Sequence, residues 1–154
     1  MNKPITRIIL IAAIAVLVTA CGKGTSNPLA AEKPSDVLTA YYKNIEQGNI
    51  MTAIDTAYSE SFKESVKANG NQGLMQVQAR ALMEKIQSHG GIDHIEIVRK
   101  DNPDGTPHID DTWTGETATE YVTLWYKTKD PRKAREWIGE THLVKENGKW
   151  GIAF

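Results

Sequence analysis

Cysteine is nearly absent from this chain of 154 residues, which contains only Cys21. An intramolecular disulfide, a zinc site built on several cysteines and a paired-cysteine redox centre are therefore excluded. The sequence also lacks a serine-nucleophile motif, a glycine-rich phosphate loop and a dinucleotide-binding fingerprint. The rest is of ordinary globular composition, with 40% hydrophobic and 24% charged residues.

An excess of basic charge is missing too. The formal net charge is −1, and the charged residues among the first twenty, Lys3 and Arg7, are both basic. Residues 21–154 therefore carry 16 basic and 19 acidic side chains, a net charge of −3. Because such a protein offers no extended positive field for phosphates, we do not expect nucleic acid as a partner.

Residues 1–21 have the three-part layout of a secretory signal. Lys3 and Arg7 make a positive start, residues 8–18 are eleven consecutive apolar residues, and Ala20 is small. The apolar run is too short to span a bilayer core, which needs about 20 residues. An uncleaved anchor and a plain signal with a coincidental cysteine are the alternative interpretations.

The end of this segment resembles the lipobox of bacterial lipoproteins. Val18 is apolar three positions before Cys21, and the small Ala20 directly precedes the cysteine. The resemblance implies that Cys21 receives a diacylglyceryl group and that cleavage falls between Ala20 and Cys21. It also implies a protein held to a membrane by lipid and facing the periplasm. Gly22, where an aspartate would favour the inner membrane, favours the outer membrane if the source is Gram-negative.

Residues 22–34 mix Gly, Ser, Asn, Pro and Ala without periodicity, which is typical of a flexible tether. We therefore expect a signal peptide over residues 1–20, a lipidated cysteine and tether over 21–34, and one folded domain over 35–154.

The first half of this domain has helical periodicity. Ser35 can cap a first helix that ends at Gly48, and Asn49 can cap a second that extends toward Phe62. A third helix is expected before the glycine pair at 90–91. Its apolar face is predicted to consist of Leu74, Val77, Ala81, Leu82 and Ile86.

After the glycine pair the period changes to two, which indicates strands. Ile95 and Ile97 alternate with polar residues, and residues 117–126 and 135–146 are further strands. Asn147-Gly148 is a hairpin signal before a last strand that ends the chain. Because helices come first and about four antiparallel strands follow, the predicted fold class is α+β, with three helices packed on a curved sheet.

Two stretches of the domain resemble the nuclear-transport-factor-2-like, or cystatin-like, superfamily. They are DVLTAYY at residues 36–42, with EQGN at 46–49 behind it, and THLVKENGKWGI at residues 141–152. The resemblance is to its small bacterial lipoprotein domains, and it implies a cone in which helices close one side of a curved sheet, often around a pocket. Ketosteroid isomerases, dehydratases, small-molecule binders and proteins that only mediate protein contacts share this fold, so the fold leaves the function open.

A pocket enzyme needs a carboxylate or a histidine inside an apolar cavity. Glu120 shares strand parity with Ala118 and Val122, so it is the carboxylate that can point inward. Core packing is the alternative for every aromatic residue near such a pocket. The candidate lining residues are Tyr41, Tyr42, Tyr58, Glu120, Trp125, Trp137 and Trp150.

No metal ion or cofactor is expected. The spacing of the four histidines fixes no common face, so solvated side chains are the simpler interpretation. Residues 101–111 contain four aspartates, but Pro103 and Pro107 interrupt the alternating oxygen ligands of a calcium loop. This segment, with a turn at 102–105, is predicted to be an acidic hairpin loop. The histidines are His89, His94, His108 and His142.

The sequence as a whole favours a non-catalytic, lipid-anchored protein of the cell envelope that binds a partner protein or a small apolar ligand. Two alternatives remain open. A pocket enzyme of isomerase or dehydratase type would be favoured by a buried Glu120 that faces a cavity. A structural or assembly factor of the envelope would be favoured by an exposed apolar patch on the sheet.

Replacing Cys21 with alanine is expected to leave the precursor uncleaved and unlipidated, because both steps depend on the thiol. Mass spectrometry of the full chain and its partition between membrane and soluble fractions measure this. Ser26→Ala in the tether is the control and should be processed like the wild type. Normal cleavage and membrane retention of Cys21→Ala would contradict the lipid anchor.

Overall fold

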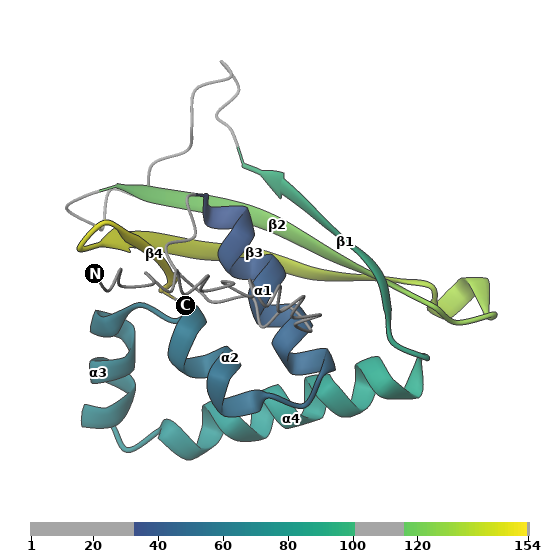
Figure 1. The fold of residues 1–154 in the computed structure, drawn as a ribbon, viewed down its shortest axis with the longest axis horizontal. Coiled ribbons are helices and arrows are strands. Elements are labelled where there is room, and N and C mark those ends of the chain that lie inside the picture. Colours follow the sequence, from purple (N-terminus) through teal and green to yellow (C-terminus); the bar gives the residue numbers. More distant parts are fainter. Residues whose placement is uncertain (1–32, 101–115, 154) are drawn as a thin grey trace, which may run out of the picture.

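The computed structural model describes residues 33–100 and 116–153, which form four helices followed by four strands (Figure 1). The helices are α1 (Pro34–Glu46), α2 (Ile50–Ala57), α3 (Glu60–Ala68) and α4 (Gln72–Ser88). The strands are β1 (Ile92–Arg99), β2 (Thr117–Tyr126), β3 (Arg135–Glu146) and β4 (Lys149–Ile152), with a short 3-10 helix η1 (Pro131–Lys133) between β2 and β3.

The strands form one antiparallel sheet in the order β1-β2-β3-β4. Asn147 and Gly148 have φ angles of 51° and 78°, as the predicted two-residue hairpin turn requires. The register shifts once at Asp93 in β1 and once at Ile138 in β3, and such bulges bend a sheet. Gly139, beside the second bulge, has a φ of 121° that favours glycine.

The helices all lie on one side of the sheet (Figure 1). α1 and α2 contact the strands, and α4 packs on α1 and α2. The largest fully buried apolar side chains come from both layers and are Leu38, Ile45, Ile86, Val122, Leu124 and Leu143. Each such side chain contributes about 1.5–3 kcal/mol through its removal from water. The predicted α+β class, with helices packed on a curved antiparallel sheet of four strands, is confirmed.

The prediction of three helices is wrong. The segment predicted as the second helix forms two separate helices, α2 and α3, so the described residues contain four. α2 ends at Ala57, Tyr58 is extended, and Ser59 caps α3 by accepting a hydrogen bond from the amide of Phe62 at 3.3 Å. The amide of Ser59 donates to the carbonyl of Ile152 at 2.9 Å. Because this hydrogen bond to β4 requires an extended backbone, the helix is interrupted at Tyr58 and Ser59. The interruption therefore depends on a residue far away in the sequence.

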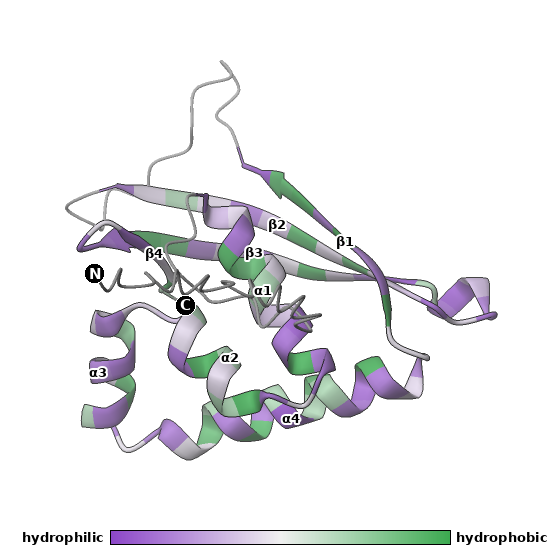
Figure 2. Ribbon diagram, viewed as in Figure 1, coloured by the Kyte–Doolittle hydropathy of each residue, from purple (hydrophilic) through white to green (hydrophobic). Residues whose placement is uncertain are grey.

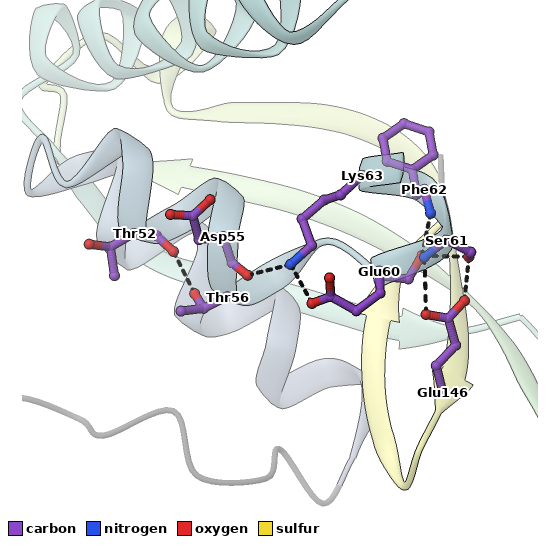
Figure 3. A network of polar contacts seen from close by, with 9 residues as sticks. Thr52, Asp55, Thr56, Glu60, Ser61, Phe62, Lys63 and Glu146 are labelled. Carbon is purple, nitrogen blue, oxygen red and sulfur yellow. Dashed lines mark hydrogen bonds and ion pairs between the residues drawn. The ribbon is translucent and has the colours of Figure 1, made fainter. Parts of the chain in front are cut away.

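Polar contacts tie α3 to its surroundings (Figure 3). The amide of Ser61 donates to Oε2 of Glu146 at 3.3 Å, and the Ser61 hydroxyl donates to Oε1 of the same carboxylate. Lys63 Nζ donates to the carbonyl of Asp55 at 3.0 Å and to Glu60 at 2.6 Å. α3 has no buried residue of its own, so these contacts and its N-cap hold it in place.

The first helix begins one residue before the position predicted for its cap. Lys33 is the N-cap and Pro34 is the first helical residue, whereas Ser35 lies inside the helix. Proline suits the first helical position because the donor that it lacks would have no partner within the helix.

The buried face of α4 also differs from the prediction. Leu82 and Ile86 face the interior, but the residues that join them are Met75, Ala79 and Met83. Leu74 and Val77 are 54% and 63% exposed. The helix has two overlapping apolar stripes at helical spacing, and the positions of α1 and α2 decide which one is covered.

The predicted strands over 117–126 and 135–146 are confirmed, as is the alternation of Ile95 and Ile97 in β1. The signal segment, Cys21 and the tether up to residue 32 lie outside the described residues. So do the acidic segment at 101–111, with His108 and the turn at 102–105, and Phe154. Within residues 33–100 and 116–153, no helix combines the length and the apolar character needed to cross a bilayer.

β4 approaches the corner between α2 and α3 closely at Gly151. A Cβ atom at this position would lie 2.6 Å from the amide nitrogen and 2.7 Å from the Cα of Ser59. Gly151→Ala is therefore expected to lower the free energy of unfolding by about 1–3 kcal/mol in urea denaturation. Gly73→Ala in α4 is the control, because a Cβ meets nothing within 4 Å there. Equal stability of the Gly151→Ala variant and the wild type would contradict this packing.

Candidate functional site

The seven predicted lining residues are divided between the two faces of the sheet. We call the face that the helices cover the inner face and the opposite one the outer face. Glu120 lies on the inner face with Ala118, Val122 and Leu124, and all four are buried. Trp125 lies on the outer face because it alternates with these positions along β2. Trp137 lies there because it pairs in register with Thr123, which also points outward. The set therefore does not surround one cavity.

The tyrosines of the set form a packed cluster beneath the sheet. Tyr41 meets Tyr42 and Tyr58 edge to face, with ring centroids 5.1 and 5.8 Å apart. Tyr58 stacks on Phe62 at 5.3 Å. Burial, with a smaller effect of Tyr58, raises the pKa of Tyr41 and of Tyr42 far above the usual range. These hydroxyls stay neutral, and the rings contribute to the core.

Glu120 and Trp150 are the other inner-face residues of the set. Glu120 is 5% exposed and stands in register between Arg99 of β1 and Thr141 of β3. The Glu120 side chain interacts with a neighbouring group. Trp150 is buried, and Lys145 Nζ lies 5.6 Å from the centroid of its ring. A buried carboxylate on the inner face is what the enzyme alternative requires, although burial alone does not make it catalytic.

An open cleft of about 560 Å³ lies elsewhere, between the α1–α2 turn and α4. None of the seven predicted residues lines it. Its lining residues are Gly48, Asn49, Ile50, Met51, Thr52, Arg80, Met83 and Glu84.

A polar network joins α4 to one end of the sheet. The Tyr126 hydroxyl donates to Oε2 of Glu136 at 2.6 Å, and Lys85 Nζ donates to Oε1. His89 stacks on Tyr126 with ring centroids 4.8 Å apart. Burial alone would raise the pKa of Glu136, but the hydrogen bonds from Lys85 and Tyr126 outweigh it and hold that pKa below its usual range. Both carboxylate oxygens are occupied, so the network serves to fix the helix on the sheet.

The outer face carries aromatic side chains held by their cross-strand neighbours. Trp125 lies between His94, which stacks on it at 5.2 Å, and the Arg135 guanidinium, 5.2 Å from the ring centroid. Its Nε1 donates to Glu96 at 3.1 Å. Lys100 Nζ lies 5.9 Å from the centroid of the Tyr121 ring. These contacts hold the aromatic groups in place on a face that none of the four described helices covers.

Two apolar side chains beside these rings project into solvent. Trp137 is 66% exposed and Val98 is 52% exposed. Tyr121 and Trp125 are half-buried, and Thr123 between them is buried. We call Val98, Tyr121, Trp125 and Trp137 the outer patch. Charged side chains border it, among them Glu96, Lys100, Arg135 and Glu140.

A basic segment lies at the end of the same two strands. Residues 127–135, which we call the hairpin tip, carry five basic side chains and one acidic side chain, Asp130. Figure 2 shows this segment as mostly hydrophilic. The tip is not among the sites predicted from the sequence because the net charge of the whole chain is close to zero, although the run KTKDPRKAR is visible there.

The described histidines lie apart. His89 is at the C-terminal end of α4, His94 is beside Trp125, and Nδ1 of His142 is 3.2 Å from the Thr119 hydroxyl. Among the described residues, no three side chains of the types that bind metal ions are close enough to hold one.

Comparisons with known proteins add little to this geometry. No protein-family model matches the chain, and no curated protein matches it. A similar solved structure is that of a Campylobacter jejuni protein proposed to be an NTF2-like transpeptidase. The two are 17% identical, the match covers 78% of this chain and 96% of the other, and the TM-score is 0.47. At this level the likeness says nothing about the activity of the present chain.

Glu136→Gln is expected to lower the free energy of unfolding by about 2 kcal/mol at pH 7, since hydrogen bonds to a charged acceptor contribute about 1.5–3 kcal/mol. The folded-state pKa of Glu136 is depressed. Its contribution is therefore present above the unfolded-state pKa and disappears as the pH falls through the folded-state pKa. The difference between variant and wild type should shrink between about pH 5 and pH 3 in urea unfolding.

Glu84→Gln is the matched control, because Glu84 is an exposed glutamate of α4 for which the described part of the chain shows no ion pair. It should change the stability little at either pH. A Glu136→Gln effect of the same size at both pH values would contradict the role assigned to the ionised carboxylate.

Proposed function

We propose that this chain is a lipid-anchored protein of the cell envelope that binds a partner protein through the outer patch and catalyses no reaction. The lipobox-like segment that ends at Cys21 supports the anchor. The exposed apolar side chains on the sheet support the binding role, and they are the feature that an assembly factor was expected to have.

The observation that carries the binding role is the exposure of Trp137. A tryptophan that is 66% exposed presents a large apolar surface to water, here on the same face of the sheet as Val98, Tyr121 and Trp125. Tryptophan, tyrosine and arginine are the residues most enriched at the centres of protein interfaces. Trp125, Tyr121 and Arg135 are already held in fixed positions by their neighbours, so binding would cost them little further conformational entropy.

The inner face supports a small apolar ligand less well. Tyr41, Tyr42 and Trp150 are buried there among aliphatic side chains of the core. Their rings occupy the space in which a ligand would lie, so the outer patch is the more accessible apolar surface among the described residues.

A pocket enzyme of isomerase or dehydratase type is the second candidate, and the burial of Glu120 favours it. A carboxylate in low-dielectric surroundings can serve as a general acid or base. Turnover of a substrate by the purified full chain, lost in a folded Glu120→Gln variant, would favour this candidate over the binding role.

Crosslinking from the outer patch tests the binding role. A photoreactive residue at position 98, in the full chain in its native envelope, is expected to give one discrete protein adduct. Trp137→Ala should reduce that adduct at least about fivefold, since truncating a central tryptophan commonly costs more than about 1 kcal/mol of binding. The same variant should keep the thermal stability of the wild type, because Trp137 is mostly in solvent.

The control places the photoreactive residue at position 77 on α4. Val77 is 63% exposed but lies on the helical side of the molecule. That position should not give the same adduct. An adduct that persists in Trp137→Ala, or one that forms equally from both positions, would contradict the outer patch as the binding surface.

A further inference from the structure

We propose that the hairpin tip docks on an anionic lipid bilayer and so fixes the orientation of the anchored domain. This inference rests on the lipid anchor of the proposed function, but it concerns a different surface from the outer patch.

The distribution of charge is the first observation. The tip has a net charge of +4 within nine residues, from Lys127, Lys129, Arg132, Lys133 and Arg135 against Asp130. The rest of residues 21–154 has eleven basic and eighteen acidic side chains, a net charge of −7. An anionic surface attracts the tip and repels the remainder, so the field of the protein itself selects one approach.

The cations of the tip are largely uncommitted. Lys127, Lys129 and Lys133 are exposed, and within the described ranges they form no ion pair. The Arg132 side chain is 89% exposed and contacts Asp130 at 3.3 Å. The nearest acids of β1, Asp93 and Glu96, already bind His94 and Trp125. Within residues 33–100 and 116–153, these three lysines therefore have no ion pair that binding would have to break.

The shape of the tip favours a flat, diffuse ligand. The segment projects at the end of β2 and β3, beyond α4 (Figure 1). A protruding surface offers no concavity to enclose a small anion. Lysine ammonium groups are hydrated point charges on flexible stems, which suit many mobile headgroups better than the fixed carboxylates of a folded protein.

The dimensions allow the anchor and the tip to reach one bilayer together. Eleven residues lie between Cys21 and Lys33, and the twelve residue steps from one to the other span at most about 40 Å. β3 has 12 residues and runs from the tip to the far end of the sheet, so the sheet is also about 40 Å long. With the tip on the bilayer, the outer patch would lie beside the membrane and remain open to a partner.

Depth-dependent quenching in vesicles tests the docking. The lipidated full chain carries a fluorophore on Ala134→Cys in the tip, which is its only free thiol because the Cys21 sulfur is alkylated. Vesicles of phosphatidylcholine alone are compared with vesicles that also contain phosphatidylglycerol, both with nitroxide-labelled headgroups. We expect strong quenching only with phosphatidylglycerol, and weakening in about 1 M salt, where charges are screened beyond about 3 Å.

The triple variant Lys127→Gln, Lys129→Gln, Lys133→Gln should reduce the ratio of docked to undocked protein about a hundredfold, since each lysine near an anionic surface contributes about a factor of five. The matched control is Lys43→Gln, Lys67→Gln, Lys149→Gln, which removes three exposed lysines outside the tip. It should keep the quenching, and a fluorophore on Ala81→Cys in α4 should show none.

Equal quenching of the tip in both kinds of vesicle, or quenching that survives the triple variant, would overturn the proposal. The proposal would also be overturned if the triple variant lost the protein adduct formed from position 98 while its quenching in vesicles stayed unchanged. The lysines of the tip would then bind an acidic protein and not the bilayer. Failure of the anchor itself is detected separately, by the mass of the Cys21 fragment and by flotation of the protein with the vesicles.

Discussion

The packing of α1 and α2 on a single face of the sheet is the contact on which the rest of the domain depends. Leu38 and Ile45 of α1 and Leu124 and Leu143 of the sheet are fully buried in this layer. α4 packs mainly on α1 and α2, and it contacts the sheet directly through Lys85 and His89. The four described helices lie on one side of the sheet, so none of them covers the outer face, and its aromatic side chains are held by neighbouring strands.

The strands could be predicted because their cause is local. Alternation along residues 117–126 and 135–146, and the turn chemistry of Asn147-Gly148, needed no knowledge of the rest of the molecule. The boundary between α2 and α3 could not be predicted in the same way. It depends on a hydrogen bond from Ser59 to Ile152, which no local pattern reveals.

The candidate site was harder to predict than the fold. Strand parity placed Glu120 correctly on the inner face, but residue type does not say on which face an aromatic ring lies. The bulge at Ile138 shifts parity along β3, so the face of Trp137 could not be read from its position. The basic tip could not be predicted from the net charge, because that value averages over the whole chain. The electrostatic field at a surface depends on the charges within about one Debye length.

The close contact between Ser59 and Gly151 also bears on when the domain can fold. The corner between α2 and α3 is fixed by β4, and the contacting residues Ser59 and Gly151 are 92 positions apart in the sequence. Contacts between such distant parts of a chain form late, because the loop between them must close first. The corner between α2 and α3 therefore reaches its final form only once β4 has joined the sheet, so the helical layer cannot finish packing ahead of the strands.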